Sequence, residues 1–224
     1  MTASPNAWPM YRAMVGVGVL CGALIVTVFL ATRPTIERNE AEALRAAILE
    51  VLPGSDSSRS FAWSVSDDRF LEPAPGTADR DLVYAGYDDA GALVGVAVEA
   101  GGMGYQDRIQ LLYGYAAARE RIVGMRVLQS RETPGLGDRI EKDPAFLANF
   151  SDLDVALAPD GHTLAHDVEA VKHGQKTEPW QVDGITGATI SSEAIATIIA
   201  RSASVWLPRI RAHVAEFAAE GGVR

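Results

Sequence analysis

The chain has 224 residues, of which 48% are apolar, and a formal net charge of −9 at pH 7, with no Lys/Arg-rich run. This composition suits one globular domain with an anchor, and its acidity disfavours nucleic acid as a partner. Cys21 is the only cysteine. It excludes an intrachain disulfide and a cysteine-ligated iron–sulfur cluster within the chain, so a redox role requires an organic cofactor.

Residues 1–12 are interpreted as an N-terminal tail, and residues 13–32 carry no charge and are nearly all apolar. At about 20 residues this run is long enough to cross a bilayer as one helix. A cleaved signal peptide is the main alternative. The run is longer than a typical h-region, and Ala31-Thr32-Arg33 is a poor cleavage site, so a membrane anchor is favoured.

Residues 33–54 follow as a predicted amphipathic juxtamembrane helix. Apolar residues recur there at helical spacing, and Pro53-Gly54 ends the pattern. The remaining chain, residues 55–224, is predicted to form the globular domain. Its first part, up to residue 80, mixes Ser, Asp, Pro and Gly with a few aromatic residues and indicates an irregular or strand-edge segment.

The middle of this domain contains an internal repeat. The pattern of Tyr84 and residues 93–98 recurs about 29 residues later as Tyr113 and residues 122–127, and each copy is split by a polar turn. Each copy predicts a β-hairpin, and two antiparallel hairpins with flanking helices indicate an α+β fold. The glycine-rich stretch Gly101–Tyr105 between them is either a loop that approaches a ligand or a simple hairpin connection.

Two helices are predicted in the second half of the domain. Asp143-Pro144 is typical of an N-cap followed by proline at the first helical position, and the helix runs from Ala145 to Phe150. The last helix is expected to begin near Ser191 or Ser192 and to be interrupted by Pro208.

Catalytic and metal-binding signals are weak. His162 and His166 are four residues apart, but Pro159-Asp160-Gly161 indicates a loop rather than the helix that would align them, so no metal site is assigned. No Ser/His/Asp order or nucleophile elbow is visible, and no catalytic residue is assigned.

Two short motifs carry the functional signal. Glu132-Thr133-Pro134-Gly135-Leu136-Gly137-Asp138 lies about fifty residues before Asp183-Gly184-Ile185-Thr186-Gly187-Ala188-Thr189. Alone, the first is a surface turn and the second is a turn with a helix N-cap. Glycines in the second allow close approach of a phosphate, and the helix expected after Thr189 offers free N–H groups and a favourable dipole.

Together the two motifs resemble the G subunit of the Rnf (Rsx) electron transport complex and, more distantly, the C subunit of the sodium-translocating NADH:quinone oxidoreductase. The resemblance implies FMN bound covalently by a phosphoester to Thr189, with Thr186, Gly187 and Ala188 beside it. It also implies that Asp183 is recognised by a magnesium-dependent flavin transferase that uses FAD. The loop expected against the flavin is formed by Glu132, Thr133, Gly135, Leu136 and Gly137.

The resemblance further implies an electron-transfer subunit of a redox-driven ion pump that works between ferredoxin and NAD, with the other Rnf subunits as partners. Three arginines follow the apolar run and one precedes it, so charge alone would place the domain in the cytoplasm. The family places it on the periplasmic side of the inner membrane, and we follow the family. A membrane-tethered flavin-binding regulatory domain is the alternative function. The quinone oxidoreductase protein ranks lower because it is usually longer.

Overall fold

The structure is a computed structural model that describes residues 8–73 and 82–218. It divides into two compact units, residues 1–44 and 45–224, of which the first contains most of one long helix and the second the globular domain. The helices and strands, in chain order, are α1 (Trp8–Val51), β1 (Ser57–Ser64), β2 (Arg69–Leu71), β3 (Leu82–Tyr87), β4 (Leu93–Met103), β5 (Arg108–Ala116), β6 (Arg121–Gln129), η2 (Gly137–Glu141), α2 (Pro144–Ala148), η3 (Asn149–Ser151), β7 (Leu153–Asp154), β8 (Glu169–Val171), β9 (Gln181–Asp183), α3 (Thr189–Ala212) and η4 (Val214–Phe217).

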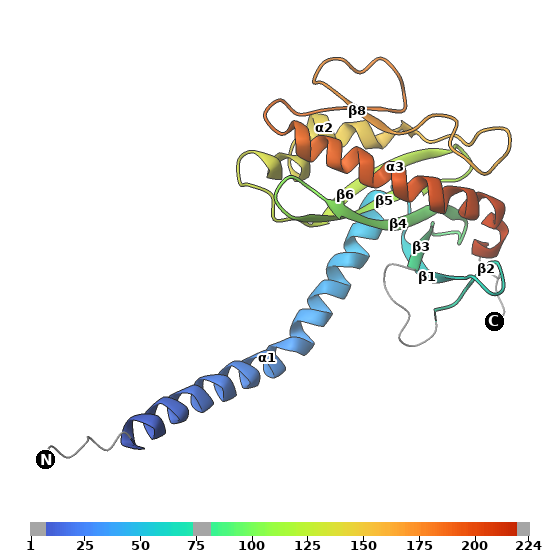
Figure 1. Ribbon diagram of the computed structural model, residues 1–224. Helices are drawn as coiled ribbons and strands as arrows, with labels where there is room; N and C mark the ends of the chain where they lie inside the picture. Colours follow the sequence, from blue (N-terminus) through green and yellow to red (C-terminus); the bar gives the residue numbers. More distant parts are fainter. Residues whose placement is uncertain (1–7, 74–81, 219–224) are drawn as a thin grey trace, which may run out of the picture. The chain divides into compact units, whose positions relative to one another are not determined.

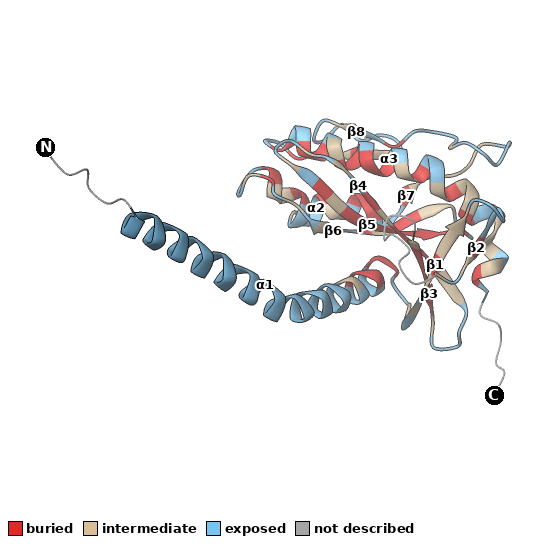
Figure 2. Cartoon of the chain, turned by 60° about the horizontal axis from the view of Figure 1, so that its bottom comes forward, coloured by how far each residue is buried: buried red, intermediate tan, exposed pale blue. Residues whose placement is uncertain are grey.

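Helix α1 contains the apolar run and the amphipathic segment in one continuous helix. It is long and apolar enough to cross a membrane, with a mean hydropathy of 2.5 in its most apolar stretch, none of which is buried in the protein. Figure 2 shows α1 exposed until its last turns. The helix already begins at Trp8, within the expected tail, while residues 1–7 lie outside the described residues. The helix continues through Pro34, and therefore the predicted membrane anchor and the predicted juxtamembrane helix are not separated by a break.

The end of α1 belongs to the globular unit, which starts at Arg45 rather than at the expected boundary of residue 55. The reason is burial: four residues before that boundary are at most 2% exposed, namely Ala47, Ile48, Val51 and Leu52. Glu50 of the same turn pairs with Arg126 on β6.

The main sheet has the strand order β2-β1-β3-β4-β5-β6-β7, with every neighbouring pair antiparallel. The predicted hairpins are confirmed as β3–β4 and β5–β6, and β4 also pairs with β5 to make them one continuous sheet. Residues Gly101–Met103 extend β4 instead of forming a loop. Only residues 104–107 make the connection to β5, so the interpretation of the whole stretch as a loop was wrong.

Helix α3 covers one face of the sheet. Figure 1 shows α3 lying across this face, with α2 and β8 nearby. Tyr113 of β5 bonds to Ser202 of α3 at 3.0 Å, and Ile198 packs so closely on Gly102 that a Cβ there would meet its side chain at 2.6 Å. β8 and β9 form a separate parallel pair, in which Val171 is opposite Asp183.

The other face of the sheet receives the end of α1 and the side chain of the following Leu52 on four glycines: Gly86, Gly95, Gly114 and Gly124. A Cβ on Gly114 would collide with the carbonyl oxygen of Val51, and one on Gly124 would meet the Cα of Val51 at 2.7 Å. Gly86 pairs with Gly95, and Gly114 with Gly124, so the four lie on adjacent strands. Their missing side chains let the helix backbone touch the sheet.

The predicted N-cap at Asp143 is confirmed, because its side chain accepts bonds from the backbone N–H groups of Ala145 and Phe146. The prediction for Pro208 was wrong: α3 continues through it to Ala212. Proline in a helix costs about 3 kcal/mol. Leu207 and Ile210 are fully buried on either side of it. Each such side chain stabilises by roughly 1.5–3 kcal/mol, which offsets that cost.

The position of the boundary leads to a prediction about truncation. A chain that starts at residue 45 should fold as a soluble domain, because it keeps the buried turn of α1. A chain that starts at residue 55 exposes the apolar surface over the four glycines and loses three large buried side chains, worth roughly 1.5–3 kcal/mol each. We expect it to aggregate or to melt at a clearly lower temperature by circular dichroism. Equal stability of the two shortened chains would place the domain boundary at residue 55.

Candidate functional site

Thr189 is the first residue of α3, two or three positions before the predicted start at Ser191 or Ser192. The N-cap residue is Ala188, with φ −132° and ψ 34°, and no side chain caps the helix. The first helical bond runs from the N–H of Ser192 to the carbonyl of Ala188 at 2.9 Å. The N–H groups before it therefore point out of the helix, where the dipole favours an anion. The side chain of Thr189 is exposed at this point.

The turn before Thr189 presents it to solvent. Gly187 has a φ of 86°, which disfavours any side chain there, and the N–H of Ala188 bonds back to the carbonyl of Ile185 at 3.0 Å. Thr186 is also exposed, and its carbonyl accepts a 2.8 Å bond from Arg139. Arg139 in turn pairs with Asp143 at 2.8 Å. The hydrogen bond from Arg139 of η2 therefore holds the turn against the segment that contains η2 and α2.

The two serines that follow Thr189 are not available for modification. Ser191 and Ser192 are 2% and 1% exposed. The hydroxyl of Ser191 donates to Glu132 at 2.6 Å, whereas that of Ser192 donates to the carbonyl of Ala188 and accepts the N–H of Ile185. Among the hydroxyls of residues 186–192, only those of Thr186 and Thr189 are exposed.

A cavity of about 370 Å³ opens beside Thr189. The predicted loop supplies Thr133, Leu136 and Gly137 to one wall, and residues 187–191 supply the other. Tyr105, from the connection between β4 and β5, completes it. The two motifs, far apart in sequence, therefore face each other across one cavity. Tyr105, Leu136 and Ile190 are 65%, 54% and 54% exposed, which gives the cavity an apolar rim.

Two of the predicted loop residues do not line this cavity. Glu132 is 5% exposed, and its carboxylate accepts bonds from Ser191 and from the N–H of Gln106 at 3.0 Å. Gly135 lies at the exposed turn of the loop with a φ of 78°, and its N–H donates to Asp138 at 2.7 Å. Glu132 and Gly135 thus shape the loop, while their neighbours form the wall.

Asp183 lies at the end of β9 and does not line that cavity. Its carboxylate accepts the N–H of Gly174 at 2.6 Å and lies 3.2 Å from His173. Its backbone exchanges two bonds with the side chain of the buried Asn149. A smaller cavity of about 200 Å³ brings Asp183 together with Thr186 and Arg139. Asp183 therefore borders the turn without reaching the apolar rim.

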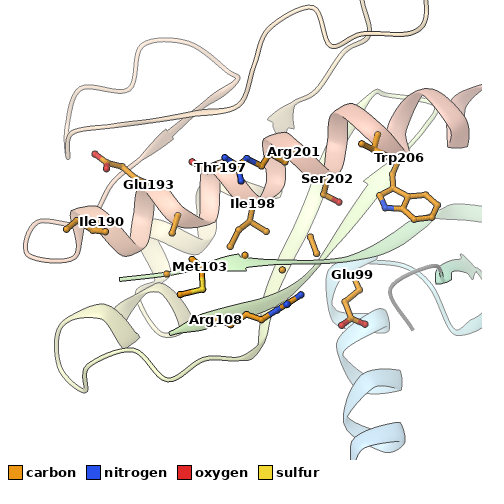
Figure 3. Close-up of a pocket in the computed structure, with 16 residues that line it drawn as sticks. Glu99, Met103, Arg108, Ile190, Glu193, Thr197, Ile198, Arg201, Ser202 and Trp206 are labelled. Carbon is orange, nitrogen blue, oxygen red and sulfur yellow. The ribbon is translucent and has the colours of Figure 1, made fainter. Parts of the chain in front are cut away.

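A second, larger groove of about 680 Å³ runs between α3 and β4 (Figure 3). Ile190 lines both this groove and the cavity beside Thr189. Farther along, Ile198 is directed toward β4, and Trp206 lies at the far end of the view. The groove extends the accessible surface next to Thr189 along the helix.

The sequence analysis missed two residues of the site, Arg139 and Ile190, and named Tyr105 only as the end of a glycine-rich stretch that could approach a ligand. No local pattern marks Arg139 or Ile190, because their positions depend on how η2 and α3 meet. His166, considered for metal binding, stacks on Trp180 with ring centroids 3.8 Å apart. No group of three or more His, Cys, Asp or Glu side chains able to hold a metal occurs among residues 8–73 and 82–218.

The donor set fits a flavin nucleotide. A phosphate placed at Thr189 would meet uncapped N–H groups, and the apolar rim beside it suits a planar ring. The volume of about 370 Å³ falls within the usual range for ligand cavities, and the open rim leaves one side of such a ring accessible.

Comparisons with known proteins agree with this geometry. A family model described as an FMN-binding domain matches residues 104–204, which include Tyr105, the Glu132 loop and the start of α3. The G subunit of an ion-translocating oxidoreductase complex from Methanosarcina acetivorans is 34% identical over 195 residues, covering 87% of this chain and 92% of the relative. The protein of the same name from Pseudomonas aeruginosa PAO1 is 32% identical over 188 residues, covering 82% and 78%.

Two solved structures share the fold. The C subunit of the Na(+)-translocating NADH-quinone reductase from Parabacteroides distasonis has a TM-score of 0.62 and 19% identity, covering 85% of this chain and 98% of that one. NqrC of Shewanella oneidensis has a TM-score of 0.59 and 17% identity, covering 80% and 96%. The α+β fold and the resemblance drawn from the two motifs are thereby confirmed. The chain belongs to the G-subunit family of ion-translocating oxidoreductase complexes.

Proposed function

We propose that this protein is a membrane-anchored electron-transfer subunit that carries FMN through a phosphoester bond to Thr189. One observation carries the proposal: Thr189 is exposed at an uncapped helix N-terminus and faces the Glu132 loop across an apolar cavity. The helix dipole stabilises a nearby anion by about 0.3–1 kcal/mol, so the protein favours the phosphate at this position.

The flavin, when bound, supplies the electron-accepting ring, and the protein supplies its position. Leu136, Ile190 and Tyr105 line the cavity, and their apolar side chains would contact the ring of a bound flavin. No base contacts Thr189 among the described residues, so bond formation requires a flavin transferase. In that reaction the hydroxyl oxygen of Thr189 forms a bond to the FMN phosphorus of FAD, AMP leaves, and the hydroxyl proton is released. Asp183, next to the turn, is the residue we assign to transferase recognition.

The direct test is mass mapping of the chain produced together with a flavin transferase. Trypsin should release residues 177–201 as one peptide. We expect its mass to increase by that of FMN less one water, with fragment ions that place the addition on Thr189. Addition on Thr186 would move the acceptor to the turn that precedes α3. An unmodified peptide from a chain that has passed through an active transferase would refute covalent attachment.

We assign the electron-transfer role to an Rnf-type complex that works between ferredoxin and NAD. The support is the family membership together with the open rim of the cavity, which leaves a bound flavin accessible to a partner protein. The other subunits are then the donor and acceptor, and turnover belongs to the complex rather than to this chain alone.

The location of the domain gives a separate prediction. Fusions after Arg224 should be active as alkaline phosphatase and dark as a cytoplasmic fluorescent protein, because we place the FMN domain on the periplasmic side of the inner membrane. The positive-inside rule favours the opposite orientation, but it rests here on only three arginines after the apolar run, and glutamates lie among them. A bright fluorescent fusion with an inactive phosphatase fusion would place the domain in the cytoplasm and require cytoplasmic redox partners.

A further inference from the structure

Glu132 is the one buried acidic residue among the described residues. Its carboxylate touches two segments besides its own: one oxygen accepts the 2.6 Å bond from Ser191 in the first turn of α3, and the other accepts the N–H of Gln106 in the connection between β4 and β5. Thr133 adds a 2.9 Å bond to the side chain of Gln106. Three segments that line the Thr189 cavity therefore meet at one side chain.

Glu132 is packed closely against two glycines, Gly104 and Gly137. A Cβ on Gly104 would collide with one carboxylate oxygen, and a Cβ on Gly137 would meet the Cβ of Glu132 at 2.9 Å and the hydroxyl of Ser191 at 3.0 Å. Both glycines are thus needed for the carboxylate to reach its partners. A buried carboxyl group is tolerated only where hydrogen bonds satisfy its oxygens, and here each oxygen has a partner.

We propose that Glu132 is a positioning residue for the flavin rather than a residue in contact with it. By holding Ser191 and Gln106 to the loop, it sets the spacing between Leu136 and Tyr105 on one side and Ile190 on the other, and so the orientation of the ring. The inference rests on the proposed attachment at Thr189, two residues from Ser191.

The test uses the full chain, flavinylated in cells, and compares Glu132→Ala with Glu132→Gln. Alanine removes both hydrogen bonds. Glutamine keeps both, since its carbonyl accepts the N–H of Gln106 and its amide donates to the hydroxyl of Ser191, which can also accept. Glu141→Gln is the matched control, because Glu141 is an exposed residue of η2, at the end of the same loop.

We expect all three variants to retain in-gel flavin fluorescence. Glu132→Ala should lose most of the visible circular dichroism and the fluorescence anisotropy of the flavin, whereas Glu132→Gln and the control should keep the wild-type signals. Ser191→Ala should reproduce part of the loss, which provides the test if Glu132→Ala does not fold.

The proposal is overturned if the flavin signals of Glu132→Ala and Ser191→Ala equal the wild type. It is also overturned if Glu132→Gln is as impaired as Glu132→Ala, because the charge and not the geometry would then matter. Loss of in-gel fluorescence in wild type would instead refute the attachment at Thr189, so the two failures are distinguishable.

Discussion

Replacing Thr189 by valine should abolish covalent flavin, so that the denatured chain shows no in-gel fluorescence after production with a flavin transferase. The change replaces the hydroxyl by a methyl group and keeps the branched shape. Because the side chain is exposed and makes no hydrogen bond among the described residues, the fold should be unaffected. The expected effect is complete, since a methyl group cannot form a phosphoester. Circular dichroism should show an unchanged domain.

Thr197→Val is the matched control for this variant. Thr197 is also an exposed threonine of α3 and lies in the same tryptic peptide, so its variant should fluoresce as wild type. If Thr189→Val remains fluorescent, the acceptor is Thr186, because Ser191 and Ser192 are buried and hydrogen-bonded. Adding a second change, Thr186→Val, should then abolish the in-gel fluorescence.

The largest loss of stability is expected from Gly114→Ala. One added methyl group would collide with the carbonyl oxygen of Val51, which is backbone and cannot rotate away. Either the last turn of α1 leaves the sheet or the sheet bends, at a cost of about 3 kcal/mol or more. For a domain of this size that lowers the melting temperature by roughly 6–12 °C. Tryptophan fluorescence during thermal unfolding measures it, since the four tryptophans include three in the domain.

Gly101→Ala provides the comparison. It is also a glycine of the central sheet, but an added Cβ would lie 3.2 Å from the flexible end of Arg108 and 3.3 Å from the carbonyl oxygen of Ile109, which are tight contacts rather than a collision. We expect a change of less than about 1 kcal/mol. If Gly114→Ala melted at the wild-type temperature, the contact between the last turn of α1 and the sheet would be wrong.

Local patterns were sufficient for much of the fold. The hairpins were visible because apolar alternation and polar turns repeat within a short stretch, and the N-cap at Asp143 because it depends on neighbouring residues alone. The end of the last helix could not be predicted from local patterns. Pro208 is a helix breaker by propensity, and only the burial of Leu207 and Ile210 keeps α3 intact.

The candidate site shows the same division. Both motifs were recognisable as short sequence patterns, and their occurrence together identified the family. Which residues of the first motif line the cavity was not readable from them. Glu132 is turned into the protein by its bonds to Ser191 and Gln106, which lie elsewhere in the chain, whereas Leu136 lines the cavity.

The sequence by itself determined the apolar anchor, the α+β class, the family and the residue expected to carry the flavin, because each depends on residues close together in the chain. Only the tertiary structure decided that the domain starts at Arg45, that Ser191 and Ser192 are unavailable, and that Glu132 holds three segments together. The physical reason is that burial and hydrogen-bond partners depend on contacts between distant segments. Four glycines on adjacent strands receive a helix end only once the sheet has formed.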